Sequence, residues 1–450
     1  MRRRRPLSPS QFLASSFLAI IVAGGVLLSL PLAAADGRHV SVLDAFFTSV
    51  SAVCVTGLIV VDTPVDLSMF GQVVVLLLIQ VGGLGYMTLS TVFVSALGRS
   101  VTLQERLTLQ EALNVQDMEG LVRFAGTVLK FTLVFEGIGA LILALRWLTV
   151  MSPGEALWHG VFHAVSAFNN AGFALWSSNL MTWRGDVTVN LVITALIIAG
   201  GLGFFVLAEL IGLRHRRVRL SVHTRLVLVA TAALLAGGTV AVLALEWNNP
   251  RTLGAMGVGD RVLAAYFQSV TARTAGFNTI DIGAMTAPAL VVMMALMFIG
   301  ASPGSTGGGV KTTTFSITLA ALWATVRGAD DTVLFKRRLA AELVAKAFFI
   351  SLIAFVALNA VAWLLLLTEG RDLLKTLFET TSAFGTVGLS MGEPGASVSL
   401  SAFFSSTGKL LIMAMMFIGR VGPLTLAIAV AKRARARPRL QYPEGKILIG

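Results

Sequence analysis

Charged residues are scarce in this chain, and cysteine is nearly absent. Only 13% of the 450 residues are Asp, Glu, Lys or Arg, whereas soluble domains typically contain about 25%. Because 56% of the residues are hydrophobic and long apolar runs recur along most of the sequence, a soluble protein is excluded and a membrane-embedded chain is predicted. The single cysteine, Cys54, excludes an internal disulfide framework and a cysteine-based metal cluster.

Eight apolar segments are long enough to span a membrane as helices. They cover approximately residues 11–32, 70–97, 124–148, 187–213, 224–246, 287–326, 341–367 and 403–431. Lys and Arg outnumber Asp and Glu by 35 to 23, and they concentrate in every second connection, on the side of both chain ends. The positive-inside rule therefore predicts a multi-pass protein of the cell membrane with both termini cytoplasmic. The basic clusters then require no nucleic acid as a partner.

The first apolar segment allows a second interpretation. Four arginines at 2–5, an apolar run and three alanines at 33–35 are together typical of a cleavable signal peptide. The apolar run is about 20 residues long, however, which suits a span better than a signal sequence, whose apolar part is about 7–15 residues. We therefore interpret it as the first spanning helix.

A glycine-containing segment recurs in the connections on the outer side. The four copies end at Gly57, Gly172, Gly276 and Gly388, and an aromatic residue precedes each glycine by ten positions. Helix-start signals precede the copies, among them a capping-box pattern from Ser152 to Glu155. A helix of about ten residues is too short to span, so each short helix is predicted to dip into the membrane and stop there.

These features predict an all-α polytopic membrane protein built from four repeats of helix, pore loop and helix around one pseudo-fourfold pore. A cytoplasmic amphipathic connector is expected between the first two repeats, and a cytoplasmic tail after the last. The expected boundaries are 1–98 for the first repeat, 99–123 for the connector, 124–213, 214–328 and 329–432 for the other repeats, and 433–450 for the tail.

The glycine segments contain no Asp, Glu or His within 53–57, 168–172, 272–276 and 384–388. A ligand bound there would be held by backbone carbonyl oxygens, which suit a weakly hydrated alkali cation. Glycine lets the backbone turn its carbonyl inward without a side chain in the lumen, and each short helix would aim its negative end at the centre. The candidate ion-binding residues are Val55, Thr56, Gly57, Asn170, Ala171, Gly172, Thr274, Ala275, Gly276, Thr386, Val387 and Gly388.

A glycine-rich run interrupts the sixth apolar segment at 300–311. It cannot remain helical, and irregular backbone at membrane depth is tolerated beside a water-filled cavity or inside protein. The run resembles a phosphate-binding loop, but that pattern requires glycine before the lysine, whereas residue 310 is valine. We therefore expect a gating loop at 300–313. The candidate gate residues are Gly300, Ala301, Ser302, Pro303, Gly304, Ser305, Thr306, Gly307, Gly308, Gly309, Lys311 and Arg420.

Several polar side chains lie within or beside these membrane segments. Arg420 follows a glycine in the last apolar segment; a buried charge is costly enough to indicate a function, and we expect it to hold the loop through carbonyl groups. Arg273 is expected to brace the third segment from behind, toward Glu379 or Asp281. His159 and His163 are one helical turn apart, but without a third ligand nearby, packing is favoured over a metal site.

Three side chains are expected to support the glycine segments by hydrogen bonds rather than to touch ions. They are Asn169, Asn170 and Thr274. The second helix of each repeat also carries glycine, which indicates a bend or a close packing below the glycine segments. These glycines are Gly82, Gly83, Gly85, Gly200, Gly201, Gly203, Gly300 and Gly419.

The chain resembles the Trk/Ktr/HKT superfamily of potassium transporters over nearly its whole length, and most closely the membrane subunit of the Ktr system. The resemblance rests on the four glycine segments, on residues 271–279 and 300–311, and on residues 443–450. A glycine in all four segments implies selectivity for K⁺, since a serine in the first is associated with sodium-permeable relatives. Only the fourth segment keeps part of the potassium-channel signature, in Thr386, Val387 and Gly388.

The resemblance also implies partners. They are a second copy of the membrane subunit, so that the chain forms a homodimer in the lipid membrane, and a cytoplasmic ring of RCK-type regulatory subunits that bind ATP or ADP. No cofactor is expected in this chain itself. Activation by Na⁺ stays open, because backbone carbonyls alone can form a sodium site.

Two mechanisms are compatible with an ion-uptake protein. The first is channel-like conduction through one gated pore, and the second is alternating access that couples K⁺ to Na⁺ or H⁺. Inverted repeats and midplane ionisable residues are typical of the second. The predicted repeats run in parallel and the glycine segments are uncharged, which favours the first.

Overall fold

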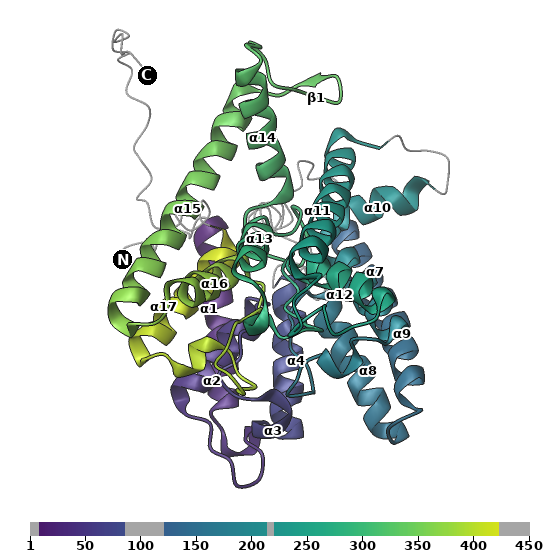
Figure 1. The fold of residues 1–450 in the computed structure, drawn as a ribbon, viewed down its shortest axis with the longest axis vertical. Coiled ribbons are helices and arrows are strands. Elements are labelled where there is room, and N and C mark those ends of the chain that lie inside the picture. The colour runs from purple at the N-terminus through teal and green to yellow at the C-terminus, as the bar shows by residue number, and fades with distance from the viewer. Residues whose placement is uncertain (1–8, 86–120, 214–219, 423–450) are drawn as a thin grey trace, which may run out of the picture.

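The structure, a computed structural model, describes residues 9–85, 121–213 and 220–422, and it is predominantly helical (Figure 1). Two short strands, β1 (Val333–Leu334) and β2 (Arg337–Arg338), pair antiparallel at the tip between two helices and depart from the all-α expectation. The expected connector at 99–123 lies outside the described residues except for 121–123. The expected tail at 433–450 lies wholly outside them.

Three kinds of helix follow one another in a fixed order along the described chain. The long helices are α1 (Pro9–Leu28), α7 (Leu121–Trp147), α11 (Val222–Glu246) and α15 (Ala341–Glu369). A short helix follows each: α2 (Val42–Val53), α8 (Pro153–Phe168), α12 (Val258–Thr271) and α16 (Leu373–Gly385). An inner helix comes third: α4 (Met69–Leu84), α9 (Val187–Leu202), α13 (Ala287–Phe298) and α17 (Ser406–Val421).

The remaining elements extend or connect these helices. The extensions are α10 (Phe204–Leu213) after α9 and α14 (Thr312–Val326) after α13. The connections contain α3 (Thr63–Asp66) and the 3-10 turns η1 (Pro31–Ala33), η2 (Met181–Trp183), η3 (Ile282–Ala284) and η4 (Leu400–Phe403).

Side-chain caps determine where the short helices begin. The capping box expected at Ser152 and Glu155 is present at the start of α8, and it satisfies N–H groups that have no partner within the helix. Ser41 and Asp372 accept hydrogen bonds from backbone N–H groups in the first turns of α2 and α16. The sequence signals therefore mark three of the four starts directly.

Glycine ends three of the four inner helices. Gly85, Gly203 and Gly422 directly follow α4, α9 and α17 with φ of 76°, 94° and 92°, in the left-handed region where glycine is favoured. Among the described residues, four helices are long and apolar enough to cross a membrane, and α9 with α10 makes a fifth although the pair bends by 102°. The eight expected spans therefore do not all appear as uninterrupted helices.

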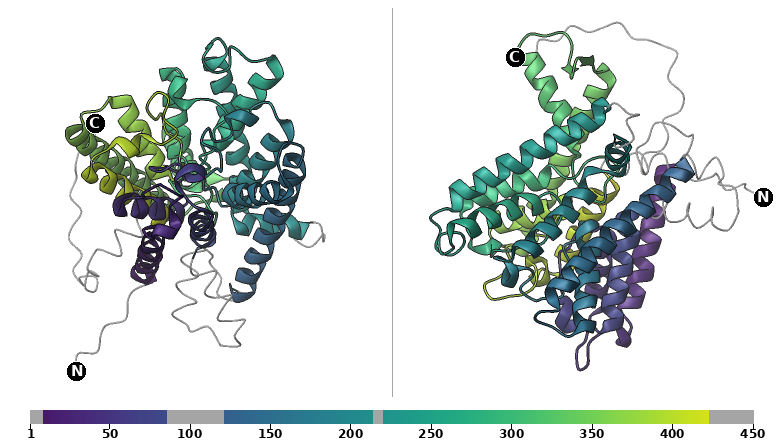
Figure 2. Two further views of the ribbon diagram at one scale, coloured as in Figure 1. Left: turned by 90° about the horizontal axis from the view of Figure 1, so that it is seen from below. Right: turned by 90° about the vertical axis from the view of Figure 1, so that its right-hand side faces the viewer.

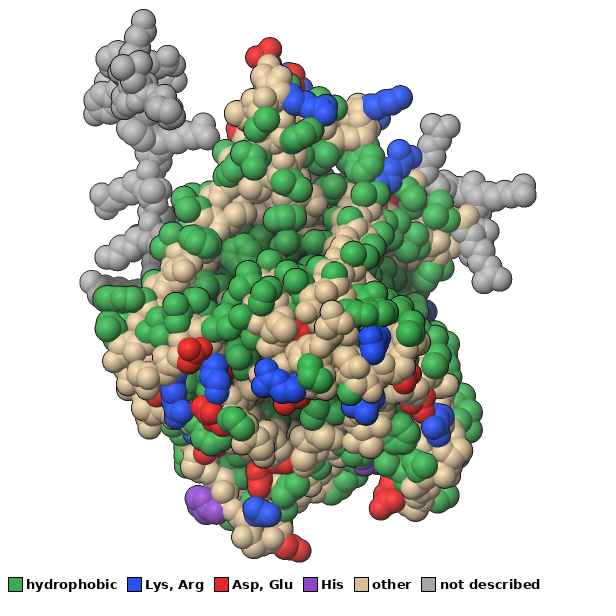
Figure 3. Space-filling view, viewed as in Figure 1, with side chains coloured by type: hydrophobic (Ala, Val, Ile, Leu, Met, Phe, Trp, Pro, Cys, Tyr) green, Lys and Arg blue, Asp and Glu red, His purple; other side chains and the backbone are tan. Residues whose placement is uncertain are grey.

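The short helices form the interior and the long helices form the perimeter. Every residue of α16 from Phe378 to Gly385 is buried, whereas only 22% of the most apolar window of α11 or α15 is buried. Hydrophobic side chains cover much of the upper half of the molecule, and charged side chains gather at the tip near β1 and across the lower half (Figure 3). This distribution suits long helices that face lipid.

Each set of one long, one short and one inner helix forms a unit, and contacts between the four units close a ring. Each inner helix packs against the short helix of the next unit: α4 against α8, α9 against α12, α13 against α16, and α17 against α2. Figure 2 shows these helices from two further directions. Since the last contact returns to the first unit, the four glycine segments that follow the short helices are brought to one place.

Candidate functional site

The four glycines at the ends of the glycine segments lie against one another in a closed ring. A Cβ atom added to any of them would meet the backbone carbonyl oxygen of the residue that precedes the next glycine. These oxygens belong to Ala171 for Gly57, Ala275 for Gly172, Val387 for Gly276 and Thr56 for Gly388. The approach is too close for any side chain, so the ring consists of backbone alone.

The four segments share two positive φ angles at equivalent positions. The residue two positions before each glycine has a positive φ, although none is glycine: 55° at Val55, 60° at Asn170, 73° at Thr274 and 48° at Thr386. The glycines have φ between 71° and 91°. Left-handed conformations of non-glycine residues cost about 1–3 kcal/mol and cluster at functional sites. Four equivalent ones identify the ring as the candidate site.

Backbone N–H groups of the segments are bonded back to the short helices. The N–H groups of Thr56, Ala171 and Val387 donate to helix carbonyls, each at 2.8 Å, and that of Ala275 donates to the carbonyl of Thr271 at 3.0 Å. Because the N–H and C=O of a trans peptide point in opposite directions, these bonds turn the preceding carbonyls away from the helices. The carbonyls of Val55, Asn170, Thr274 and Thr386 are therefore free to face the centre.

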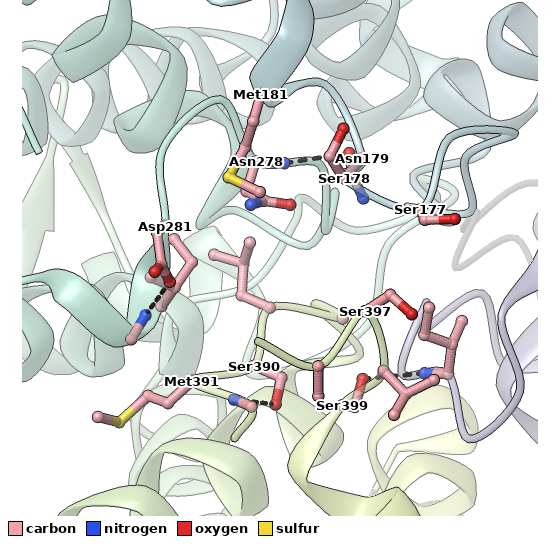
Figure 4. Close-up of a pocket in the computed structure, with 18 of the residues that line it drawn as sticks. Ser177, Ser178, Asn179, Met181, Asn278, Asp281, Ser390, Met391, Ser397 and Ser399 are labelled. Carbon is pink, nitrogen blue, oxygen red and sulfur yellow. Dashed lines mark hydrogen bonds between the residues drawn. The ribbon is translucent and has the colours of Figure 1, made fainter. Parts of the chain in front are cut away.

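A cavity of about 670 Å³ opens on one side of the ring. All four ring glycines line it, together with polar residues of the outer loops (Figure 4). Asn179 and Asn278 lie on one side and Ser390 and Ser399 on the other. Among its charged residues, Lys375 pairs with Glu393 at 3.0 Å, whereas the Oδ1 atom of Asp62 is buried without a hydrogen-bond partner among the described residues.

The glycine-rich loop lies on the other side of the ring. The Asn170 side chain donates to the Thr306 hydroxyl at 2.9 Å, and the Gly308 N–H donates to the Thr386 hydroxyl at 3.0 Å. A Cβ atom on Gly307 would overlap the hydroxyl of Thr274. Three of the four left-handed residues thus contact the loop through their side chains. The Thr274 hydroxyl has no hydrogen-bond partner among the described residues, so its expected role as a donor or acceptor is wrong.

The inner helices hold the loop from further sides. The N–H groups of Ser302 and Thr306 donate to carbonyls of α9 at 3.0 and 3.2 Å, and that of Gly309 donates to a carbonyl of α17 at 3.3 Å. The Lys311 ammonium donates to the carbonyl of Gly307 at 2.7 Å, within the loop itself. The interruption between α13 and α14 is therefore an ordered segment that spans from one inner helix to another.

Arg420 ties this loop to the first unit. Its guanidinium donates to the carbonyl of Thr306 in the loop and to the carbonyls of Gly82 and Gly83 in α4, the last at 3.1 Å. The sequence predicted the contact with the loop but not the contact with α4. No salt bridge is formed by Arg420 in the part of the chain that the structure describes, so the positive charge is held by carbonyl dipoles.

The glycines of the inner helices allow close packing rather than bends in mid-helix. A Cβ on Gly82 or Gly200 would overlap the carbonyl oxygen of the last residue of a short helix, and one on Gly419 would overlap that of the next-to-last residue of α16. The inner helices therefore touch the ends of the short helices directly behind the ring. Each of these helices ends three residues later, at a glycine with positive φ, and at Gly203 the chain bends by 102° into α10.

The contact of Arg273 with Glu379 or Asp281 is not formed within the described ranges. Glu379 accepts hydrogen bonds from Ser390 at 2.6 Å and from the N–H of Ser401 at 2.9 Å, and the Oδ1 atom of Asp281 accepts one from the backbone of its own turn. Arg273 itself is 6% exposed, and its Nε has no partner within the described ranges. Glu379, within α16, is used by the connection that follows its own helix, and Asp281 caps the turn η3.

His159 and His163 lie in an aromatic cluster. The ring of His163 packs 4.5 Å from Trp176 and 5.2 Å from Trp147, and its Nε2 accepts the N–H of Leu175 at 3.2 Å. Residues 9–85, 121–213 and 220–422 contain no group of three potential metal ligands. These contacts are typical of packing residues, and they hold α8 against the chain segment that follows the ring glycine.

The sequence patterns did not predict a role for two buried residues near the ring. Glu136 on α7 and Gln80 on α4 form a buried hydrogen-bonded network with Asn169, the residue that ends α8. An acidic residue within a long apolar segment is the signal that could have revealed Glu136.

Comparison with known proteins gives consistent matches. A family model described as "TrkH: Cation transport protein" matches residues 8–437. The chain is 43% identical over 444 residues to the Ktr system potassium uptake protein B of Bacillus subtilis (strain 168), covering 98% of this chain and 97% of the relative. It is 42% identical over 439 residues to the protein of the same name from Vibrio alginolyticus, covering 97% and 93%.

The fold has a solved counterpart. The crystal structure of the potassium transporter TrkH from Vibrio parahaemolyticus superimposes with a TM-score of 0.72 at 20% sequence identity. The match covers 93% of this chain and 85% of that structure. The arrangement of helices around the glycine ring is therefore similar to that of a known fold.

Proposed function

The chain belongs to the TrkH family of cation transport proteins, and on this premise we propose that it is a potassium uptake protein of the cell membrane, of the Ktr type. Its relatives carry the name of potassium uptake proteins, so the chain is a transporter and not an enzyme. The observation that carries the proposal is the closed backbone ring of Gly57, Gly172, Gly276 and Gly388 at one end of the cavity. A ring of carbonyl dipoles without fixed charge suits a dehydrated K⁺.

We infer a pore formed by four repeats of one chain, with eight spans and both termini in the cytoplasm. The fixed order of long, short and inner helices supports this architecture, as does the closed cycle of packing between units. The spans interrupted by glycine are tolerable because the freed backbone lies inside the protein and beside the pore.

The selectivity filter consists of backbone carbonyls from the four segments. Bonding of the N–H groups to the short helices turns the carbonyls of the left-handed residues away from those helices; the carbonyls of the following residues lie against the neighbouring ring glycines. The short helices add their negative ends at the same place. The filter residues are Val55, Thr56, Gly57, Asn170, Ala171, Gly172, Thr274, Ala275, Gly276, Thr386, Val387 and Gly388.

The loop at 300–311 and Arg420 form the gate. The loop contacts the filter residues on the side away from the cavity, so an ion leaving the filter has to pass it. Arg420 holds the loop through Thr306 and adds a positive charge on the path of a cation. Opening of the pore therefore requires that hydrogen bonds of the loop break. A partner that moves the loop would remove this barrier.

We propose that the chain works as a homodimer regulated by a KtrA-like cytoplasmic ring of RCK-type subunits that bind ATP or ADP. The names of the relatives, which place them in a Ktr system, support a membrane subunit with further components. Sodium activation would act on this assembly. Channel-like conduction is favoured over alternating access because the filter is one closed ring rather than a site shared between two moving halves.

Ion flux into liposomes that contain the purified protein tests the proposal. Uptake of K⁺, Rb⁺, Na⁺ and Li⁺ is compared for the wild type and for Gly388→Ser, whose hydroxymethyl group would meet the carbonyl of Thr56. We expect K⁺ and Rb⁺ to enter well ahead of Na⁺, and the variant to lose this preference. Flux without preference, or flux insensitive to Gly388, would contradict the pore assignment; absence of flux calls for the same assay with the cytoplasmic partner present.

A further inference from the structure

A buried carboxylate lies directly behind the second filter segment. Glu136, in the long helix α7, is only 6% exposed. Its Oε1 accepts a hydrogen bond from the Asn169 side chain at 2.9 Å, and its Oε2 accepts one from Gln80 at 3.3 Å. No Lys, Arg or His pairs with it within the described ranges, so two neutral amides from two other helices are its partners.

Asn169 is the link between this carboxylate and the filter. It ends α8 three residues before Gly172, and its side-chain amide also donates to Gln80 at 3.0 Å and to the carbonyl of Val165 at 2.9 Å. Its Oδ1 has no hydrogen-bond partner in the described part of the chain and lies against Gly83, where an added Cβ would overlap it. The amide is thus fixed between α7, α4 and its own helix.

This arrangement occurs in one of the four segments. The residues three positions before the other ring glycines are Cys54, Arg273 and Gly385, and none of them can offer a carboxamide. The residue after Asn169 is Asn170, which has a left-handed φ of 60° and donates to Thr306 in the loop. A shift of Asn169 would therefore be transmitted to the filter carbonyls and to the loop at once.

We propose that Glu136 is a positioning residue that sets ion selectivity through Asn169, an inference that rests on the proposed function. The carboxylate fixes the Asn169 amide, the amide fixes the end of α8, and the end of α8 orients the carbonyls of Asn170 and Ala171. An acidic group within an apolar span is costly and is retained where it has a function. Helix packing alone would be served better by an apolar residue, since buried polar groups need partners.

Substitution of Glu136 tests this role against simple helix packing. Glu136→Leu removes both acceptors, whereas Glu136→Gln keeps one oxygen for Asn169. In the liposome assay we expect the ratio of K⁺ to Na⁺ flux to fall about tenfold in the leucine variant, equivalent to about 1.4 kcal/mol. The glutamine variant is expected to stay within about threefold of the wild type, because the hydrogen bond to Asn169 survives.

Glu246→Leu is the matched control. Glu246 is a second buried glutamate of a long helix, at the end of α11, and it accepts hydrogen bonds from Thr286 and Asn249, outside the filter. Its substitution is expected to lower thermal stability without changing the K⁺ to Na⁺ ratio. A folded Glu136→Leu protein with an unchanged ratio would overturn the inference while leaving the proposed function intact, since wild-type flux reports on that function separately.

A double-variant cycle tests whether the effect passes through Asn169. If it does, Glu136→Leu and Asn169→Leu together change the flux ratio no more than the larger single effect, because both remove the same hydrogen bond. Additive effects would refute the path. If Glu136→Leu does not fold in the membrane, Gln80→Leu serves as the second variant, because it removes one donor to the carboxylate. It is expected to lower the ratio of K⁺ to Na⁺ flux by a smaller factor. An unchanged flux ratio in Gln80→Leu would count against the network.

Discussion

Replacing Arg420 by alanine is expected to increase ion flux in the absence of any cytoplasmic partner. The guanidinium joins the loop, at the carbonyl of Thr306, to α4, at Gly82 and Gly83. Hydrogen bonds from charged donors contribute about 1.5–3 kcal/mol each. The bond to Thr306 holds the loop in place beneath the filter. Its loss is therefore expected to shift the equilibrium of the loop from the blocking to the open position by about 10- to 150-fold.

Uptake of Rb⁺ into liposomes measures this shift. Arg420→Lys keeps the charge but has no planar fork for two carbonyls, and we expect its flux to lie between wild type and alanine variant. The matched control is Arg146→Ala, because Arg146 pairs with Asp186 at 2.6 Å, at the start of α9 and away from the loop. That control is expected to lose stability without a gain in flux. A folded Arg420→Ala protein that conducts no faster than the wild type would refute the gating role.

Three further predictions concern the ring, the cavity and a helix start. Gly276→Ala places a Cβ against a backbone carbonyl at a residue with φ of 81°, and it should abolish selective K⁺ flux. The control is Gly237→Ala, whose Cβ meets nothing within 4 Å and which should leave flux unchanged. Equal flux in both variants would contradict the assignment of the ring as the selectivity filter. Asp62→Asn removes from the cavity wall a carboxylate whose Oδ1 has no hydrogen-bond partner among the described residues. It should reduce uptake at low K⁺ severalfold, and less so at high ionic strength, because the attraction is screened; an effect independent of salt would argue against it. Ser152→Ala removes the capping box of α8 and should lower the free energy of unfolding by about 1 kcal/mol, seen as a lower thermal midpoint in detergent, with ion preference retained.

Local patterns in the sequence predicted the parts of the site that depend on backbone. The four glycine segments were recognisable because each needs glycine at the same place, and the capping box of α8 was recognisable because it uses a fixed spacing. The break at 300–311 was predictable since glycine and proline cannot continue a helix. The contact of Arg420 with the loop followed from the cost of a charge at membrane depth.

Side-chain partners distant in sequence were predicted poorly. Arg273 was assigned a carboxylate that is in fact used by its own neighbours, and the network of Glu136, Gln80 and Asn169 was not foreseen. These residues meet only because α4 packs against α8 and α7 packs against both α8 and α9. Such contacts depend on the order in which units surround the pore, which composition and periodicity do not specify.

Apolar length and glycine content act locally, so the amino-acid sequence alone specifies the membrane environment, the fourfold recurrence of a glycine segment and the interruption of one inner helix. Packing of the whole chain specifies which carbonyl each glycine approaches, which side of the ring the loop covers, and where the inner helices end. The reason is that a ring of backbone has no partners until all four units have packed. Its geometry is therefore a property of the closed cycle and not of any one segment.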